Sequence, residues 1–132
     1  MYDVRLVGEV TRLVMADIEA VRRFLNDLRE VLKTGGKFYL VPRQKNRDAL
    51  LRMGLTINNC RREVMSLVVE DYCSGPDSDF DSRFKGAVWT FGKEIYEVRM
   101  YIKVKVVKTD VHQAVTCISF HEAEYPLRNV YR

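Results

Sequence analysis

The sequence predicts an α+β protein, in which N-terminal helices pack on a twisted, mainly antiparallel β-sheet that ends in a C-terminal β-meander. Two periodicities predict this class. Between residues 16 and 67, apolar residues recur at steps of three and four, which is the period of helices. From residue 87 onward, apolar and polar residues alternate, which is the period of strands. Since the helices come first, a sheet covered by helices on one side is expected.

The longest helix is expected over residues 16–34, where an apolar stripe runs along one side. Asp17 is the expected N-cap, and Glu19 is expected to pair with Arg23 one turn later. The glycines at 35 and 36 should end this helix.

Further elements are expected before the meander. Residues 38–41 read as a short strand, 45–53 as a small helix, and 59–67 as a third helix capped by Thr56 or Asn58. Residues 70–86 combine Gly, Pro and Ser with several Asp and Glu, a composition typical of a loop. Strands are then expected over 87–95, 98–108 and 114–121.

Residues 1–14 read either as a strand or as the start of a helix, and Met15 could be an alternative start. They are treated as a possible N-terminal extension of a single domain that covers residues 1–132. No apolar run reaches the roughly 20 residues that cross a bilayer, and no segment resembles a signal peptide. A cytoplasmic protein without a membrane partner is expected.

The cysteines and histidines are few and scattered. Cys60, Cys73 and Cys117 are odd in number and widely spaced, so they build neither a disulfide framework nor a paired metal motif. His112 and His121 lie far from the first two cysteines, and nothing favours a zinc site. Cys60 and Cys117 are expected in the core, and no metal or cofactor is expected.

The net charge of +4 is unevenly spread. Bases dominate residues 22–62 and again the part of the chain from residue 83 onward. Between them, residues 63–82 carry no base and the acids Glu63, Glu70, Asp71, Asp77, Asp79 and Asp81. Two basic regions suit a polyanion such as RNA, although solvated helix faces would give the same count.

The central strand of the meander separates two faces. Its apolar side belongs to the core, and its other side carries Arg99, Tyr101, Lys103 and Lys105. A final hairpin centred near Asp110 would place Tyr101 opposite Ser119, Lys103 opposite Cys117, and Arg99 opposite His121. A two-residue turn at positions 96 and 97 would place Thr90 opposite Lys103 and Gly92 opposite Tyr101.

This polar face suggests RNA cleavage by attack of the RNA's own 2′-hydroxyl. Such cleavage needs a base, a proton donor, and cations that hold the charge on the phosphorane. Tyr101, Lys103 and His121 are the candidate catalytic residues, and the reaction needs no metal. The candidate RNA-binding residues are Thr90, Lys93, Arg99, Lys105, Tyr125 and Arg128. The alternative is a solvated sheet whose lysines and arginines prevent aggregation.

Four stretches resemble the MqsR-like (motility quorum-sensing regulator) toxins. They are MGLT at 53–56, VEDYCSGP at 69–76, VWTFGKEI at 88–95 with MYIK at 100–103, and CISFHEAEYPL at 117–127. The resemblance implies a RelE-like fold and an mRNA interferase held inactive by an antitoxin that is usually DNA-binding. It places the family's tyrosine on Tyr101 and the lysine of that strand on Lys103.

At three positions the chain departs from the family's site. A glutamine is replaced by Thr90, a lysine by Ser74, and a second lysine by His121, whose imidazole can still transfer a proton near neutral pH. The segment 122–128 extends past better-known members, and Tyr125 and Arg128 would either close over RNA or anchor the terminus.

The expected function is therefore an mRNA-cleaving toxin of a toxin–antitoxin pair, which inhibits translation. Two rivals share the same sequence features. One is a non-catalytic module that binds RNA or the ribosome through the basic face. The other is a protein-interaction domain whose acidic segment, residues 70–81, meets a basic partner.

Overall fold

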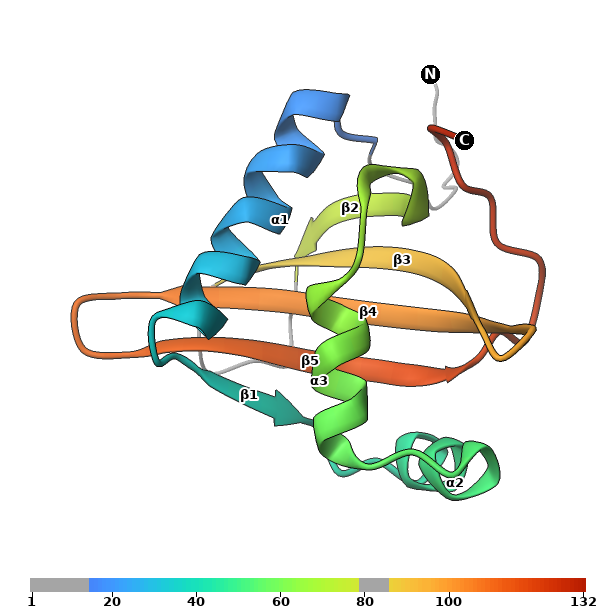
Figure 1. The fold of residues 1–132 in the computed structure, drawn as a ribbon. Coiled ribbons are helices and arrows are strands. Elements are labelled where there is room, and N and C mark those ends of the chain that lie inside the picture. Colours follow the sequence, from blue (N-terminus) through green and yellow to red (C-terminus); the bar gives the residue numbers. More distant parts are fainter. Residues whose placement is uncertain (1–14, 79–85) are drawn as a thin grey trace.

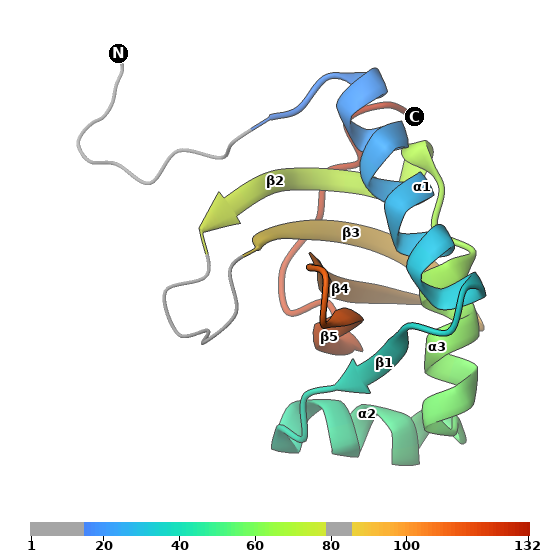
Figure 2. The same cartoon turned by 90° about the vertical axis from the view of Figure 1, so that its left-hand side faces the viewer.

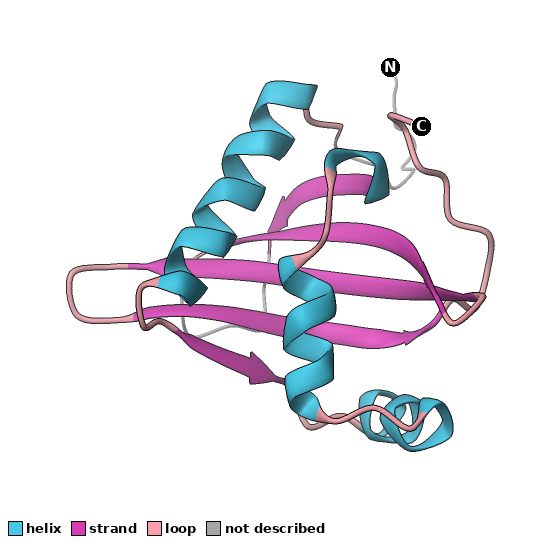
Figure 3. Cartoon of the chain, viewed as in Figure 1, coloured by secondary structure: helices cyan, strands magenta, loops and turns pink. Residues whose placement is uncertain are grey.

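The computed structural model describes residues 15–78 and 86–132 and has the α+β architecture that the sequence predicts (Figure 3). Its elements are α1 (Ile18–Lys33), β1 (Lys37–Leu40), α2 (Gln44–Met53), α3 (Ile57–Met65), the 3₁₀ turn η1 (Val69–Asp71), β2 (Tyr72–Ser78), β3 (Ala87–Ile95), β4 (Val98–Lys108) and β5 (Gln113–Glu122) (Figure 1). The helices come first and the meander β3–β4–β5 follows, as expected.

The sheet has five strands in the order β1-β5-β4-β3-β2. β1 runs parallel to β5, and every other pair is antiparallel. The expected two-residue turn between β3 and β4 is confirmed: Tyr96 and Glu97 both have positive φ, at 52° and 66°. That backbone twist matches the twist of the flanking strands, which allows a tight hairpin without glycine.

The loop expected over residues 70–86 is wrong in its first half. Residues 69–78 form η1 and β2, and β2 pairs with β3 along the edge of the sheet. Tyr72 at the start of β2 is fully buried against the core, so tertiary packing overrides the loop-like composition of the segment. Residues 79–85 of that expected loop, and the possible extension 1–14, lie outside the described residues.

The helix ends follow their capping residues. Asp17 caps α1 through its side chain, as expected, but Glu19 pairs with Arg22 rather than with Arg23. The third helix begins at Ile57, two residues earlier than expected, because Thr56 caps it and Asn59 returns the hydrogen bond to the backbone of Thr56.

α1 and α3 lie on one face of the sheet, and α2 lies beside β5 at the sheet's edge (Figure 2). The core between helices and sheet is lined by aromatic rings: Phe24 of α1 stacks on Trp89 of β3 with ring centroids 4.5 Å apart. Cys60 and Cys117 are fully buried in this core, as the sequence predicts. The opposite face of the sheet is not covered by α1 or α3.

Trp89→Ala tests this core. Removing the indole that stacks on Phe24 should lower the free energy of unfolding by about 3–5 kcal/mol, measured by urea denaturation. Tyr39→Ala, on the exposed side of β1, should change it by less than about 0.5 kcal/mol. Equal effects of the two substitutions would contradict the assignment of Trp89 to the core.

Candidate functional site

Three rows of side chains cross the face of the sheet opposite to α1 and α3. The rows, read from β2 toward β5, are Asp77–Val88–Lys105–Thr116, Ser74–Thr90–Lys103–Ser119, and Gly92–Tyr101–His121, the last beginning on β3. Cross-strand neighbours in such rows have Cβ atoms about 4.5–5.5 Å apart, so their side chains lie next to one another. Tyr101 and Lys103 therefore lie in neighbouring rows at the middle of the face.

The expected register between β4 and β5 is wrong by two residues. Tyr101 lies opposite His121 rather than Ser119, and Lys103 lies opposite Ser119 rather than Cys117. Arg99 consequently does not face His121. One residue of the shift lies in the hairpin, which pairs Cys117 with Val104 instead of Lys103, and the other comes from a bulge that inserts Ile118 between Cys117 and Ser119. The expected pairs of β3 and β4, Thr90 with Lys103 and Gly92 with Tyr101, are confirmed.

A buried asparagine from α2 holds the bulged part of β5. Asn46 is fully buried, and its Nδ2 donates hydrogen bonds to the carbonyls of Val41 (2.9 Å) and Ile118 (3.0 Å). Its Oδ1 accepts a hydrogen bond from the backbone N–H of Phe120 (2.9 Å). Since β1 pairs with β5 only as far as Cys117, this side chain bonds backbone groups of β5 beyond the end of β1.

The register places the imidazole of His121 against the phenol ring of Tyr101, with ring centroids 5.4 Å apart. Nδ1 of His121 lies 3.0 Å from the carbonyl oxygen of Glu122. A carbonyl only accepts, so Nδ1 carries the proton of the neutral ring and Nε2 carries the lone pair. Nε2 has no hydrogen-bond partner among the described residues. The arrangement therefore presents a proton acceptor next to Tyr101.

Several other functional atoms on this face are also unused by the fold. The Tyr101 hydroxyl, the Lys103 ammonium and the Asp77 carboxylate make no hydrogen bond or ion pair with any described residue. Burial raises the pKa of Asp77, and the nearby Lys103 opposes that rise. These polar groups line a hollow of the surface and are not engaged by the fold, so they are available to a ligand that enters it.

These side chains line two adjacent pockets, which are together called the groove. Its wide part has a volume of about 600 Å³, and its narrow part a volume of about 170 Å³. Both parts are bordered by Tyr101, Lys103, Tyr125 and Leu127. A third cavity of about 380 Å³ continues past His121 toward α2. The groove thus runs across the sheet face with Tyr101 and Lys103 at its centre.

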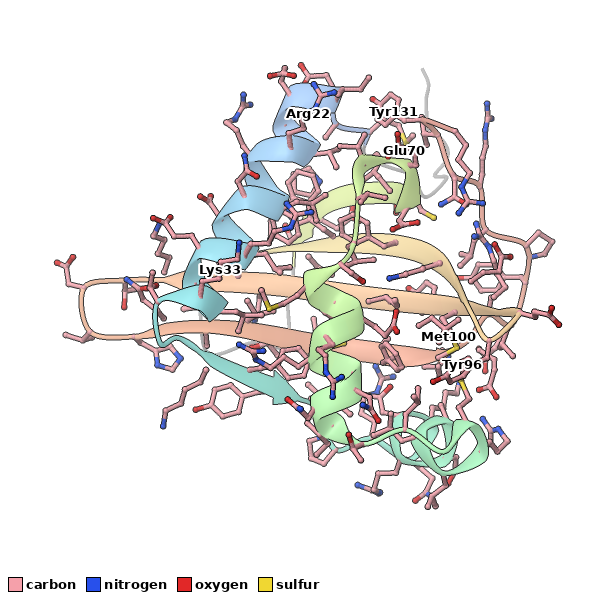
Figure 4. All side chains as sticks on the ribbon, viewed as in Figure 1. Arg22, Lys33, Glu70, Tyr96, Met100 and Tyr131 are labelled. Atoms are coloured by element: carbon pink, nitrogen blue, oxygen red, sulfur yellow. The ribbon has the colours of Figure 1, made fainter. Side chains whose placement is uncertain are left out.

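The C-terminal tail, residues 123–132, forms one wall of the groove. Tyr131, labelled beside Glu70 in Figure 4, stacks on Tyr72 with ring centroids 5.8 Å apart. Asn129 donates hydrogen bonds to the carbonyls of Asp71 (2.9 Å) and Gly92 (3.1 Å). The tail is therefore anchored at η1 and at β3, which favours the anchoring alternative for the end of the tail.

Gly92 makes the close approach of the tail possible. A Cβ on this residue would lie 3.0 Å from Arg99 Nη2 and 3.1 Å from Leu127 Cδ1. Arg99 itself donates hydrogen bonds to the carbonyl of Leu127 and to Asn129. Arg99 thus fixes the tail, and its guanidinium is engaged by the protein.

The predicted site residues divide into two groups. The structure brings Tyr101, Lys103, His121, Thr90, Tyr125 and Arg128 together on the groove. It leaves three predicted RNA-binding residues apart. Lys93 lies on the helix side, where it pairs with Glu63 at 2.9 Å. Arg99 is held by the tail, and Lys105 is only 3% exposed.

Sequence reasoning missed three residues of the groove. Arg43 donates a hydrogen bond to the Ser119 hydroxyl (3.3 Å), and Lys45 pairs with Glu124 (2.7 Å). Both come from the start of α2, and the basic run after Pro42 was the available signal.

Asp77 was missed because residues 70–86 were read as a loop. Asn46 extends the inward stripe of α2 formed by Ala49, Leu50 and Met53, a spacing that could have identified it.

No group of three or more His, Cys, Asp or Glu side chains within residues 15–78 and 86–132 is arranged to hold a metal ion. In the same two segments, no helix combines the length and apolar character needed to cross a membrane. Comparisons of the chain with known protein families, with curated proteins and with solved structures found no match.

Asn46→Leu tests the hydrogen bonds that hold the bulge. The leucine would leave the Phe120 N–H and the Ile118 carbonyl unsatisfied, which costs about 1–3 kcal/mol for each group. We expect a corresponding loss in the free energy of unfolding and faster hydrogen exchange at the Phe120 amide. Asn26→Leu, on the exposed side of α1, is the control. An unchanged Phe120 amide in Asn46→Leu would contradict the account.

The Arg52–Glu122 pair predicts a dependence of stability on pH. Two hydrogen bonds from Arg52, at 2.8 and 2.7 Å, lower the pKa of Glu122 from 4.5 to about 2. Because the folded-state pKa is depressed, the stabilisation is fully present above pH 4.5 and is lost as the pH falls toward 2.

Arg52→Met should therefore lose less stability than the wild type when the pH is lowered from about 6 to about 3. Urea denaturation at the two pH values gives the measurement. Arg62→Met, on the exposed side of α3, should keep the wild-type difference. The same pH dependence in Arg52→Met and in the wild type would show that the pair does not depress the pKa of Glu122.

Proposed function

We propose that this chain is an endoribonuclease that binds single-stranded RNA in the groove and cleaves it without a metal ion. The observation that carries the proposal is the meeting of an imidazole, a phenol and an ammonium at the centre of one groove. The functional atoms of His121, Tyr101 and Lys103 have no partner among the described residues. Those three groups are the parts that cleavage by an internal hydroxyl requires.

In the proposed mechanism, Nε2 of His121 takes the proton of the 2′-hydroxyl. The 2′-oxygen attacks the adjacent phosphorus, and the bond from phosphorus to the 5′-oxygen breaks. The Tyr101 hydroxyl gives its proton to that leaving oxygen. The products are a 2′,3′-cyclic phosphate and a 5′-hydroxyl end. The phenolate then recovers a proton from the imidazolium, whose ring lies 5.4 Å away between centroids, so both groups return to their starting states.

The phosphate is held by two cations that line the narrow part of the groove. Lys103 comes from the middle of the sheet, and Arg43 comes from the start of α2 and is bonded to Ser119. Two cations converging on a non-bridging oxygen stabilise the charge that builds up in the phosphorane. Lys103 is the stronger candidate because its ammonium makes no hydrogen bond or ion pair with a described residue, whereas Arg43 already donates a hydrogen bond to Ser119.

The aromatic rings suit a single strand. Tyr125 is 62% exposed, and its ring centroid lies 6.5 Å from that of Tyr101. Exposed aromatic rings beside a cationic groove stack on unpaired bases, which double-stranded RNA does not offer. The tail therefore contributes a stacking ring to the groove while its end anchors the chain terminus.

The biological setting is proposed from the resemblance to MqsR-like toxins. Messenger RNA as the substrate, a DNA-binding antitoxin as the partner, and action in the cytoplasm all rest on the four similar stretches. Tyr101 and Lys103, the two positions at which the chain keeps the family's site residues, lie together at the centre of the groove, which is consistent with RNA as the class of substrate. An antitoxin that covers this groove would inhibit the toxin by excluding RNA.

The second candidate is an RNA-binding module that does not cleave. The chain has Ser74 where the family has a lysine and Thr90 where it has a glutamine. These changes favour the second candidate, because the Ser74 hydroxyl cannot replace the charge of the lysine. The protein-interaction alternative depends on the acidic segment 70–81, whose last residues lie outside the described part of the chain.

The two histidines provide a matched test of cleavage. His121→Gln should slow the cleavage of a defined RNA by about 10²–10⁴-fold, because it removes the proposed base. His112→Gln, in the turn that precedes β5, should cleave like the wild type. The reactions contain EDTA, and the product ends are mapped. Loss of wild-type cleavage in EDTA, or wild-type rates in His121→Gln, would contradict the proposal.

Two lysines of β4, Lys103 and Lys108, provide a test of RNA binding that does not depend on cleavage. Lys103→Met should weaken RNA binding and reduce the slope of log affinity against log salt by about 0.7, the contribution of one phosphate on a single strand. Lys108→Met, whose ammonium pairs with Glu30 on the helix side, should leave that slope unchanged. Tight binding without cleavage by the wild type would select the non-catalytic module.

A further inference from the structure

The wide part of the groove differs in chemistry from the phosphate-binding part. Its apolar lining comes from Met15, Pro126, Leu127 and Val130, with Tyr101 and Tyr125 beside them. Its volume of about 600 Å³ is within the range of small-molecule pockets. Apolar and aromatic walls suit a flat ring and do not suit a phosphate, whose charge would lose water without gaining partners.

β2 and β3 contribute three polar side chains to this part of the groove. Ser74 and Thr90 face each other across the two strands, and Asp77 lies one row further along. The Asp77 carboxylate is half-buried and has no hydrogen bond or ion pair with a described residue. A carboxylate shielded from water in this way gains most from a ligand that donates two hydrogen bonds to it.

We propose that the wide part of the groove is a nucleobase subsite in which Asp77 selects guanine. An ionised carboxylate only accepts hydrogen bonds, through two oxygens. The pairing edge of guanine carries two adjacent donors, N1–H and the N2 amino group, which match those oxygens. Adenine, cytosine and uracil each place an acceptor next to a donor on that edge, so each would set a lone pair against a carboxylate oxygen.

The subsite is next to the scissile phosphate, because Tyr101 and Lys103 border both parts of the groove. Lys103 lies close enough to Asp77 to affect its ionisation. The selected guanine is therefore the nucleotide beside the cleaved bond. This inference rests on the proposed function for its substrate, RNA, but the binding of a base by Asp77 can be measured without cleavage.

The test uses the full chain and short RNAs with 2′-O-methyl groups, which bind but cannot be cleaved. The RNAs are identical except at one purine position, which holds guanine, inosine or adenine. Inosine lacks only the N2 amino group. The wild type should bind the guanine RNA about 10- to 100-fold more tightly than the inosine or adenine RNA, the range of a bidentate contact with a base.

Asp77→Asn should reduce the ratio of guanine to adenine affinity by at least about 10-fold, because an amide pairs with the donor and acceptor of adenine. Asp27→Asn, on the exposed side of α1, should keep the wild-type ratio. The inosine comparison needs no protein variant, so it remains decisive if Asp77→Asn fails to fold.

The outcomes separate the two proposals. Equal wild-type affinity for the three RNAs, or an unchanged preference in Asp77→Asn, overturns the guanine subsite and leaves the cleavage proposal standing. A guanine preference that depends on Asp77, in a protein that cuts no RNA, supports the subsite and overturns the proposed function.

Discussion

The site depends on the hydrogen bonds between the buried amide of Asn46 and the backbone of β5. β1 is too short to pair with all of β5. Without this side chain, the Ile118 carbonyl and the Phe120 N–H would have no hydrogen-bond partner on that edge of β5. The amide also keeps the extra residue, Ile118, within the strand as a bulge. Because the bulge moves each later residue by one position, His121 comes to lie opposite Tyr101.

The two faces of the sheet have different roles in the protein. The face toward α1 and α3 contains the aromatic core, and the stacked pair of Phe24 and Trp89 contributes to stability there. The opposite face keeps Tyr101, Lys103 and Asp77 without partners among the described residues. Polar groups without partners in the protein do not stabilise the fold. The core and the anchored tail supply the stability, so the side chains on this face can serve ligand binding instead.

The order of helices and strands could be predicted because periods of 3.6 and 2 are local properties of the sequence. The β4–β5 register could not. A strand pattern repeats every two residues, so pairing Tyr101 with Ser119 or with His121 puts the same side chains on the same face. The two registers differ by one residue in the placement of the hairpin and by one in the bulge, and the bulge depends on Asn46, which is distant in the sequence. β2 was missed for a similar reason, because its pairing with β3 is a tertiary contact.

The central claim is that RNA lies across Tyr101, Lys103 and His121. The most direct measurement is a crystal structure of the full chain with a short 2′-O-methyl RNA. The account predicts a phosphate oxygen within hydrogen-bond distance of Lys103 Nζ and the adjacent 2′-oxygen next to His121 Nε2. An RNA bound on the helix side of the sheet, or bound with its phosphates away from Lys103 and His121, would contradict it.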